Sequence, residues 1–302
     1  QDAEVSDTVF PAGMRIDSGS GGAGMAGIDM KFNDCSMADG SDFENVFPGS
    51  VINSSNVVVD DEKLVRVAKI GGTYYETLAE AFAAAKSGDE IEILKAGTYA
   101  LNTSGKDITI TGAVAGVVFD NIGARNLGGA DVTFNNVTFD YYPNADYTGL
   151  QHSGNLVYNN CTINGQVFLY GQSETFNNCT FNQNSADAYN VWTYGAEKVA
   201  FNEFTFNSAG KSVLIYAESA GITNDISVTN STFNASAPVD GKAAIEIDTS
   251  LTAGAKITVD AATTANGFSD GNVSGNSLWN NKKDNTNDAN NDITVVVDGE
   301  TV

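Results

Sequence analysis

The chain has 302 residues, of which 42% are hydrophobic and only 18% charged, so it can bury a sizeable core and needs no more than one main domain. Its formal charge of −23 repels nucleic-acid phosphates and anionic lipid surfaces, which excludes a nucleic-acid-binding protein. No apolar run approaches the roughly 20 residues of a membrane span, so we expect no membrane insertion.

Residues 1–55 show no repeat and combine a glycine-rich tract at 18–24 with an acidic stretch at 34–48. We interpret them as an arm that attaches to a protein on a cell or particle surface, or as a lid on the rest of the chain. The start at Gln1, without Met or an apolar leader, is what a matured product would show. Such a start is compatible with export or virion assembly, and we expect an extracellular location, on a cell surface or a virion surface.

Residues 56–89 are predicted to form a hairpin followed by a helix. Two apolar runs, 56–59 and 64–70, flank the charged turn 60–63. Thr77 and Glu80 match a helix capping box, and Gly88 ends the helix. The apolar residues between them share one helical face: Leu78, Ala81, Phe82 and Ala85. Such a helix would cover the open end of a stack of repeats.

A five-residue phrase, Asn-Asn-Cys-Thr-Phe with its variants, returns five times. The copies occupy residues 135–139, 159–163, 177–181, 202–206 and 229–233. Their threonines are 24, 18, 25 and 27 residues apart, and a period of this size indicates one structural unit stacked on copies of itself. Each unit reads as short alternating strands separated by Gly, Asn and Ser. The pattern predicts an all-β parallel β-helix solenoid of about nine coils.

A second set of strands aligns within the same repeat, at residues 167–170, 191–194, 213–216 and 244–247. The column that contains Glu246 must face outward because it accepts a charge. We therefore place two columns of the opposite parity in the interior: Phe168, Trp192, Leu214 and Ile245, and Tyr170, Tyr194, Tyr216 and Ile247. A tyrosine column on the outer face would instead be a platform for sugars.

Residues 74–99 and 106–112, with the sequences YYETLAEAFAAAKSGDEIEILKAGTY and KDITITG, resemble the opening of right-handed parallel β-helix proteins of the pectate-lyase-like superfamily. The resemblance is to members found in bacterial surface proteins and phage structural proteins, and residues 267–279 are similar to the close of such domains. It covers residues 56–302 and implies the fold, with residues 1–55 as a separate arm. One scaffold hosts many activities, so the resemblance does not specify a function.

The enzymes of this superfamily provide a test for catalysis. Its polysaccharide lyases pair a basic residue with calcium held by carboxylates, and its glycoside hydrolases use clustered Asp residues with Gly-His-Gly and Arg-x-Lys segments. In this chain the adjacent pair Asp60–Asp61 precedes the first coil, His152 lacks the preceding glycine, and no arginine follows Arg125. We therefore assign no catalytic residues.

One carboxylate pair keeps an enzymatic alternative open. Glu246 and Asp248 are two residues apart on one predicted strand, so they would project from the same face, near Glu218 of the preceding coil. Such a pair is the minimum for a glycosidase. The alternative is that these are solvated acids on an acidic protein.

The insertion 141–147, between the first two clear repeats, holds the candidate ligand-binding residues Tyr141, Tyr142 and Tyr147. Loops carry recognition in solenoids, and sugars favour aromatic faces, so we expect glycans as ligands of this insertion. Alternatively, the insertion packs back over its coil.

The loop 284–292 places oxygen ligands on alternate residues, a spacing that calcium loops use. The candidate Ca²⁺ ligands are Asp284, Asp288 and Asp292, although no downstream Glu or central Gly completes the pattern. A plain solvated loop is the alternative.

Two cysteines, Cys161 and Cys179, occupy the same position in successive repeats. Side chains in one column point the same way, so we expect stacked buried thiols and no disulfide between them.

Together these observations predict a non-enzymatic, surface-displayed structural or adhesive protein: a phage virion decoration or a bacterial adhesin, with glycans as the expected ligands. The alternative is a carbohydrate-active enzyme, a polysaccharide hydrolase or lyase, with acids at coil edges or across a subunit interface. Virion proteins with this fold are often trimers, which makes a homo-oligomer an expectation by analogy.

Overall fold

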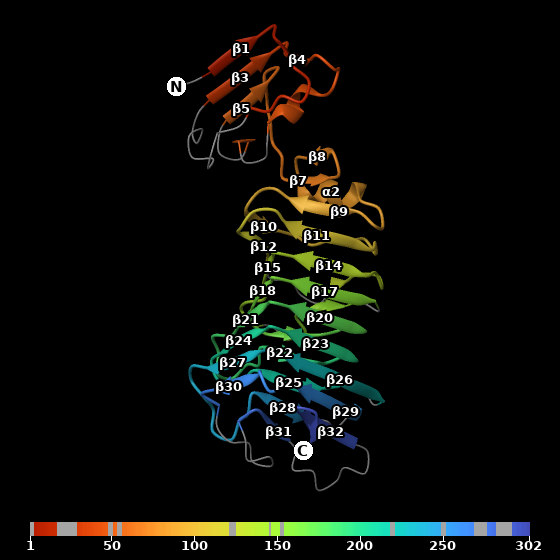
Figure 1. Ribbon diagram of the computed structural model, residues 1–302, viewed down its shortest axis with the longest axis vertical. Helices are drawn as coiled ribbons and strands as arrows, with labels where there is room; N and C mark the ends of the chain where they lie inside the picture. The colour runs from red at the N-terminus through yellow and green to blue at the C-terminus, as the bar shows by residue number, and fades with distance from the viewer. Residues whose placement is uncertain are drawn as a thin grey trace.

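The computed structural model describes residues 3–16, 29–47, 51–52, 56–120, 125–144, 146–151, 154–217, 221–248, 252–268, 277–281 and 292–302. In this part of the chain the protein is mostly β-strand, and α2 (Leu78–Ala84) is its main α-helix. The strands form long parallel sheets that extend along one axis of the molecule (Figure 1). The expected all-β class is confirmed.

Three sheets follow the stack. The first has twelve strands, nine of them parallel: β9 (Glu90–Ile93), β11 (Ile108–Gly112), β14 (Val132–Asn135), β17 (Asn155–Asn159), β20 (Ser173–Asn177), β23 (Lys198–Asn202), β26 (Ile222–Thr229), β29 (Thr252–Val259) and β32 (Asp292–Val297). The second has eight: β10 (Gly97–Tyr99), β12 (Val117–Asp120), β15 (Thr138–Asp140), β18 (Thr162–Asn164), β21 (Thr180–Asn182), β24 (Thr205–Ser208), β27 (Thr232–Ala235) and β30 (Thr264–Asn266). The third has five: β19 (Val167–Phe168), β22 (Val191–Trp192), β25 (Val213–Tyr216), β28 (Ile245–Asp248) and β31 (Trp279–Asn281). A separate short pair joins β13 (Arg125–Asn126) to β16 (Leu150–Gln151).

Successive repeats superimpose in strict register. Thr138 pairs with Thr162, Thr162 with Thr180, and the column continues through Thr205 and Thr232. We call the strands contributed by one repeat a rung. The nine parallel strands of the first sheet give nine rungs, the number that the spacing of the phrase predicts.

The two asparagines of the repeated phrase have different structural roles. The second lies at the turn between the first and second sheets, in the left-handed region that Asn tolerates better than branched residues, with φ of 57°, 54° and 50° at Asn136, Asn160 and Asn178. The first builds an amide ladder along the first sheet. Asn177 donates to the side chain of Asn159 at 2.8 Å and accepts from Asn202 at 2.9 Å.

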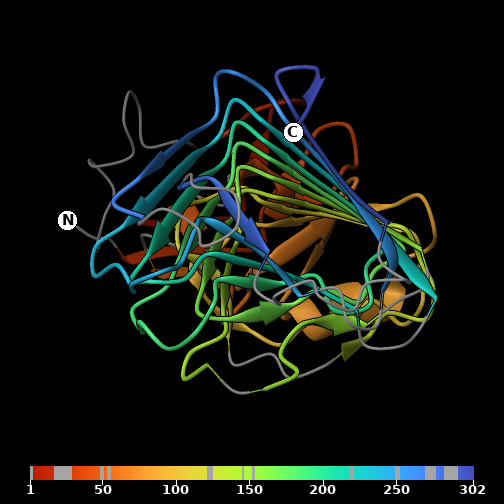
Figure 2. The same cartoon turned by 90° about the horizontal axis from the view of Figure 1, so that it is seen from below.

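The interior of the stack is filled by side chains of all three sheets, and its aromatic rings come mainly from the first two. Phe176 stacks on Phe201 with ring centroids 5.3 Å apart, and Phe206 stacks on Phe233 at 4.4 Å. All four rings are buried. Viewed along the stack, the rungs superimpose around this common interior (Figure 2). Burial of such rings is the main favourable contribution to the folding free energy.

The predicted capping helix is confirmed, but it ends at Ala84, before the expected end at Gly88. The N–H of Glu80 donates to Thr77 Oγ1 at 3.2 Å, and the N–H of Thr77 donates to Glu80 Oε2 at 3.0 Å, which completes the capping box. Leu78, Ala81 and Phe82 are buried against the first rung. The antiparallel hairpin of β7 (Ala68–Ile70) and β8 (Thr73–Tyr75) pairs with β9 and closes this edge. At the opposite end, β33 (Glu300–Thr301) folds back on β32.

The described residues between 3 and 63 form a smaller stack. Its parallel strands are β1 (Ala3–Ser6), β3 (Asp29–Asn33) and β5 (Asn56–Val59), with β6 (Glu62–Lys63) antiparallel to β5; β2 (Val9–Phe10) pairs with β4 (Ser36–Met37). It has its own core, which includes Phe32, Phe43 and Phe47 and the 3-10 helix Phe43–Val46. The smaller stack extends past residue 55, where the expected arm ends, because residues 56–63 pair with its strands.

This smaller stack contains a copy of the repeated phrase that the sequence analysis missed. Asn33, Asp34 and Cys35 are followed by Ser36 and Met37 where other copies have Thr and Phe. Asp34 takes the turn position with φ of 50°. The thiol of Cys35 donates to a carbonyl of the preceding rung and to that of Asn33, and the thiols in the main stack follow the same pattern.

Arg66 connects the two stacks. Its buried guanidinium donates to the carbonyl of Phe47 at 3.3 Å and lies 3.7 Å from the carboxylate of Glu44, both in the smaller stack. The same group lies 3.7 Å from the centroid of the Tyr74 ring, in β8 of the main stack.

Candidate functional site

The third sheet turns its aromatic columns outward, which overturns the expected interior placement. Val213 and Ile215 lie in the main core, so Leu214 between them faces away from it. The register pairs Val213 with Ile245 and Leu214 with Glu246. The sequence alignment had paired Val213 with Ala244, and a shift of one residue exchanges the two faces of a strand.

The outward columns and their neighbours form one cluster, which we call the aromatic patch: Tyr147, Phe168, Tyr170, Tyr189, Trp192, Tyr194 and Tyr216. Phe168 stacks on Trp192 of the next rung with centroids 5.2 Å apart. Tyr194 stacks on Tyr216 at 5.9 Å. The regular stacking follows from the parallel register, which places equivalent residues of neighbouring rungs side by side.

Tyr147 is the most exposed ring of the patch. It is 55% exposed, stacks on Phe168 with centroids 5.6 Å apart, and contacts Tyr194 edge-on. Its φ of 62° places it in the left-handed region, which is costly for a bulky residue and is held here by the ring contacts. The insertion that carries it therefore adds the outermost ring to a stack built by the rungs.

The three tyrosines predicted as ligands occupy three environments. Tyr141 is buried in the interior and stacks on Phe139 with centroids 6.1 Å apart. Tyr142 donates its hydroxyl to the carbonyl of Asn182 at 3.1 Å. Only Tyr147 joins the aromatic patch. Tyr141 and Tyr142 thus pack back on the coil, as one of the two interpretations expects, whereas Tyr147 leaves much of its ring exposed.

Tyr142 borders a polar groove of about 390 Å³ beside the second sheet. Asparagines of successive rungs form its wall: Asn182, Asn207 and Asn234. Their amides are linked in a second ladder, in which Asn207 donates to Asn182 at 3.0 Å and Asn234 donates to Asn207 at 3.3 Å. The groove offers amide and hydroxyl groups without a charged side chain.

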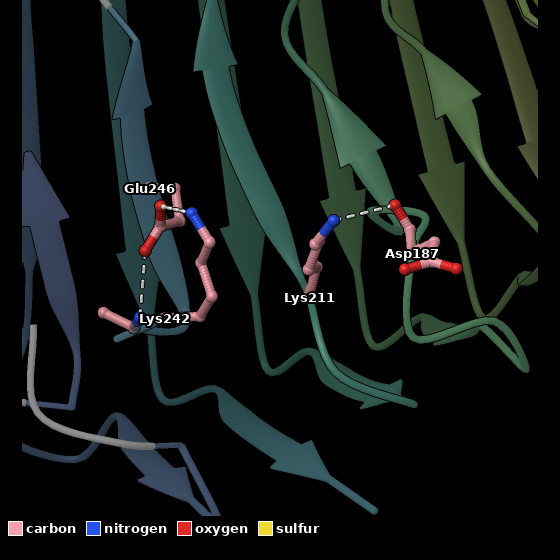
Figure 3. Close-up of polar contacts among 5 residues, drawn as sticks. Asp187, Lys211, Lys242 and Glu246 are labelled. Atoms are coloured by element: carbon pink, nitrogen blue, oxygen red, sulfur yellow. Dashed lines mark hydrogen bonds and ion pairs between the residues drawn. The ribbon is translucent and has the colours of Figure 1, made fainter. Parts of the chain in front are cut away.

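A charged cluster lies at the other end of the outward columns (Figure 3). Glu246, fully buried, accepts from Lys242 Nζ at 2.9 Å and from the N–H of Ala243 at 3.0 Å. Burial raises the pKa of the Tyr189 hydroxyl above its ordinary value, and the nearby carboxylates Glu246 and Asp248 add to the shift. Both acids lie on the face of β28 that is turned away from the main core, so their expected placement on one face is confirmed. Both are buried, however, so the alternative of solvated surface acids is wrong.

In this cluster Glu246 forms an ion pair with Lys242, which does not suit it to act as a catalytic acid or base. Both oxygens of Glu246 already accept hydrogen bonds, and Lys242 neutralises its charge. On the neighbouring rung Lys211 donates to the carbonyl of Asp187 at 3.0 Å (Figure 3). Glu218, which was expected near the pair, lies outside the described residues.

The acid with the most clearly shifted titration lies in the interior. Burial raises the pKa of Glu174 to about 7, and the group is only 2% exposed. Its oxygens accept from the N–H of Gly171 at 2.9 Å and lie 3.5 Å from the hydroxyl of Tyr158. A ligand on the outer face does not reach this carboxyl, so its raised pKa affects the stability of the fold and not ligand binding.

The expected calcium loop falls largely outside the described residues. Asp284 and Asp288 are not described, and Asp292 is described only as the first residue of β32, without its side chain. His152 also lies outside. Among the residues that the structure places, no group of three or more His, Cys, Asp or Glu side chains is arranged to hold a metal ion.

The cysteines agree with the stacked-thiol interpretation. Cys161 and Cys179 are buried and free, and Cys35 is a partly exposed free thiol.

No helix in the described part of the chain is long and apolar enough to cross a membrane. Comparison of the chain with protein-family models, with curated proteins and with solved structures gives no match in any of the three.

Proposed function

We propose that this chain is a right-handed parallel β-helix protein, displayed on a cell or virion surface, that binds glycans through the aromatic patch. The stack of rungs in register, the amide ladders and the capping helix support the β-helix assignment. An extracellular location, a homo-oligomer and attachment through the smaller stack belong to the same proposal.

A single observation carries the glycan-binding proposal: the exposed ring of Tyr147 ends a stack of aromatic rings on the outer face of the third sheet, where it covers the buried ring of Phe168. Exposed aromatic rings grouped in a patch are typical of binding sites, and sugars present C–H faces that pack on aromatic rings. The polar groove beside Tyr142 would supply hydrogen bonds to sugar hydroxyls. The charge of −23 favours neutral glycans over polyanionic ones.

The experiment is a glycan array probed with the intact chain, followed by titration of any bound neutral glycan. Tyr147→Ala is expected to weaken binding about fivefold, since stacking interactions of this kind contribute roughly 1 kcal/mol. Val114→Ala, at another exposed apolar residue, serves as the matched control and should leave binding unchanged. Absence of binding to every glycan, or equal binding by the Tyr147 variant, would reject the patch as the site.

A second candidate function, hydrolysis of a polysaccharide, rests on Glu246 and Asp248 facing the same side of β28 beside the patch. It predicts release of reducing ends that is abolished in both Glu246→Gln and Asp248→Asn. We favour binding because Lys242 already engages Glu246.

A further inference from the structure

The outer face of the second sheet repeats one pair of side chains on successive rungs. In β21, Thr180 and Asn182 are two residues apart, and Phe181 between them is buried in the core. Side chains alternate along a strand, so the threonine and the asparagine both face away from the core. Four further strands along the stack have the same pair: β18, β24, β27 and β30 (Figure 1).

The register aligns these pairs into two columns, which we call the threonine–asparagine array: Thr162, Thr180, Thr205, Thr232 and Thr264 beside Asn164, Asn182, Asn207, Asn234 and Asn266. Two acids mark its margins. Asp140 precedes the asparagine column in β15, and Glu203 lies at the turn before Thr205. The array itself holds no charged residue, in a protein whose formal charge is −23.

The preference of threonine for strands does not account for the array. One outer column of the first sheet also contains Thr109, Thr133 and Thr175, but it includes Val157 and Ala200 as well. A strand accepts any of these residues at a half-exposed position. The same residue at every rung is required only where side-chain atoms must keep a constant spacing, and the second sheet meets that requirement on five rungs.

The array is rigid and keeps hydrogen-bonding groups for a ligand. Asn182 donates to the side chain of Asn164 at 3.0 Å and accepts from Asn207 at 3.0 Å. This uses one N–H and one lone pair of the amide, so one of each remains. Threonine is stiff about χ1 because its Cβ is branched. Within the described part of the chain, no side-chain hydrogen bond engages the hydroxyls of the threonine column.

The spacings of the array are close to those of ice. Neighbouring rungs are ~4.8 Å apart, and residues two apart on a strand are separated by about 6.7 Å. In ice each water has four neighbours at about 2.75 Å in tetrahedral directions. That geometry places second neighbours about 4.5 Å apart and repeats the stacked layers every 7.3 Å or so, roughly. Each spacing of the array therefore lies within about a tenth of an ice repeat.

We propose that this protein binds ice through the threonine–asparagine array. A periodic solid offers the same partners to five identical rungs, and ice offers neutral donors and acceptors at these spacings. The threonine hydroxyls and the remaining amide groups hydrogen bond to waters of the lattice, and the threonine methyl groups lie against the same layer. Charged side chains would have to lose their hydration first, and the array has none. This activity goes beyond glycan binding and uses a different sheet from the aromatic patch.

The test grows ice slowly on a cold surface from a dilute solution of the intact chain. The readouts are the fraction of protein in the ice and the gap between the melting and freezing points. We expect the chain to enter the ice and to open such a gap. Thr180→Tyr puts a bulky ring at the centre of the array and should abolish both effects. Thr175→Tyr, in the same rung but on the outer face of the first sheet, is the matched control and should retain both.

Exclusion of the unmodified chain from the ice, undiminished activity of Thr180→Tyr, or equal loss in Thr175→Tyr would each overturn the proposal. If the tyrosine variants do not fold, the isosteric Asn207→Asp replaces them: it adds a charge to the array and should abolish ice binding. Asn202→Asp makes the same change in the amide ladder of the first sheet and should retain it. Undiminished activity of Asn207→Asp, or loss in both aspartate variants, would also reject the array. Glycan binding, measured separately, should be unchanged in all four variants.

Discussion

The backbone N–H of Cys161 donates to the Sγ of Cys179 in the next rung, at 3.3 Å. The thiol of Cys179 in turn donates to the carbonyl of Tyr158 in the preceding rung. Ser231, at the equivalent position two rungs further, makes the same two hydrogen bonds. Its hydroxyl donates to the carbonyl of Phe201 and accepts from the N–H of Phe204. Where this column holds a small polar side chain, that side chain therefore links rungs at the turn between the first two sheets.

This relationship predicts that Cys179→Ser is tolerated, because Ser231 shows that a hydroxyl fits the same carbonyl and N–H partners. We expect a loss of about 1 kcal/mol or less in the free energy of unfolding, measured by urea denaturation. Cys179→Ala leaves the buried N–H of Cys161 without its acceptor and should cost about 1–3 kcal/mol. Equal stability of the serine and alanine variants would show that the hydrogen bond contributes nothing.

Alanine substitutions of the insertion's tyrosines should differ in their effect on the free energy of unfolding, because the rings lie in different environments. Tyr141→Ala removes a buried ring stacked on Phe139 and is expected to cost about 3–5 kcal/mol. Tyr147→Ala, at an exposed ring, should change the free energy of unfolding by about 1 kcal/mol or less. Thermal and urea unfolding of the two variants measure the difference. A large loss at Tyr147 would mean that this ring supports the fold and would weaken its assignment to binding.

Glu174 should make the stability fall as the pH rises. Its carboxyl releases its proton near the ordinary pKa of 4.5 when unfolded but holds it to about 7 when folded. The native state therefore binds more protons between these values, and its stability declines from pH 4.5 to pH 7 by up to about 3 kcal/mol. Glu174→Gln should remove this decline and be the more stable protein at pH 8. Parallel pH profiles of the unfolding midpoint test this, and identical slopes for the two proteins would contradict it.

Arg66 should couple the smaller stack to the main one. Arg66→Ala removes the contacts with Phe47, Glu44 and Tyr74, and we expect faster hydrogen exchange in residues 29–59 with little change in residues 90–260. The expected loss is about 2–3 kcal/mol, since the group is buried and its partner Glu44 is partly exposed. Lys31→Ala, at an exposed ion pair with Asp61, is the matched control and should leave exchange unchanged. Uniform acceleration across both stacks would show that they unfold as one unit.

Much of the candidate site could not be predicted because of a single ambiguity in register. The third-sheet strands are short, and the segment Ala244–Ile247 can be aligned with Val213 in two ways that differ by one residue. Both alignments place apolar residues in the core, so hydrophobicity did not decide between them. The charge of Glu246 correctly indicates the face turned away from the main core, although the side chain is buried there, but the residues grouped with it are one position away from its true neighbours.

By itself, the sequence determined that equal units stack and where each rung turns, because a left-handed turn favours Asn or Asp and an amide ladder repeats Asn in successive rungs. It also determined the capping helix, whose hydrogen bonds are local. Only the tertiary structure decided that the rings of the third sheet face outward and that Tyr147 lies on Phe168. Both depend on contacts between segments distant along the chain, and one residue of register exchanges core for surface.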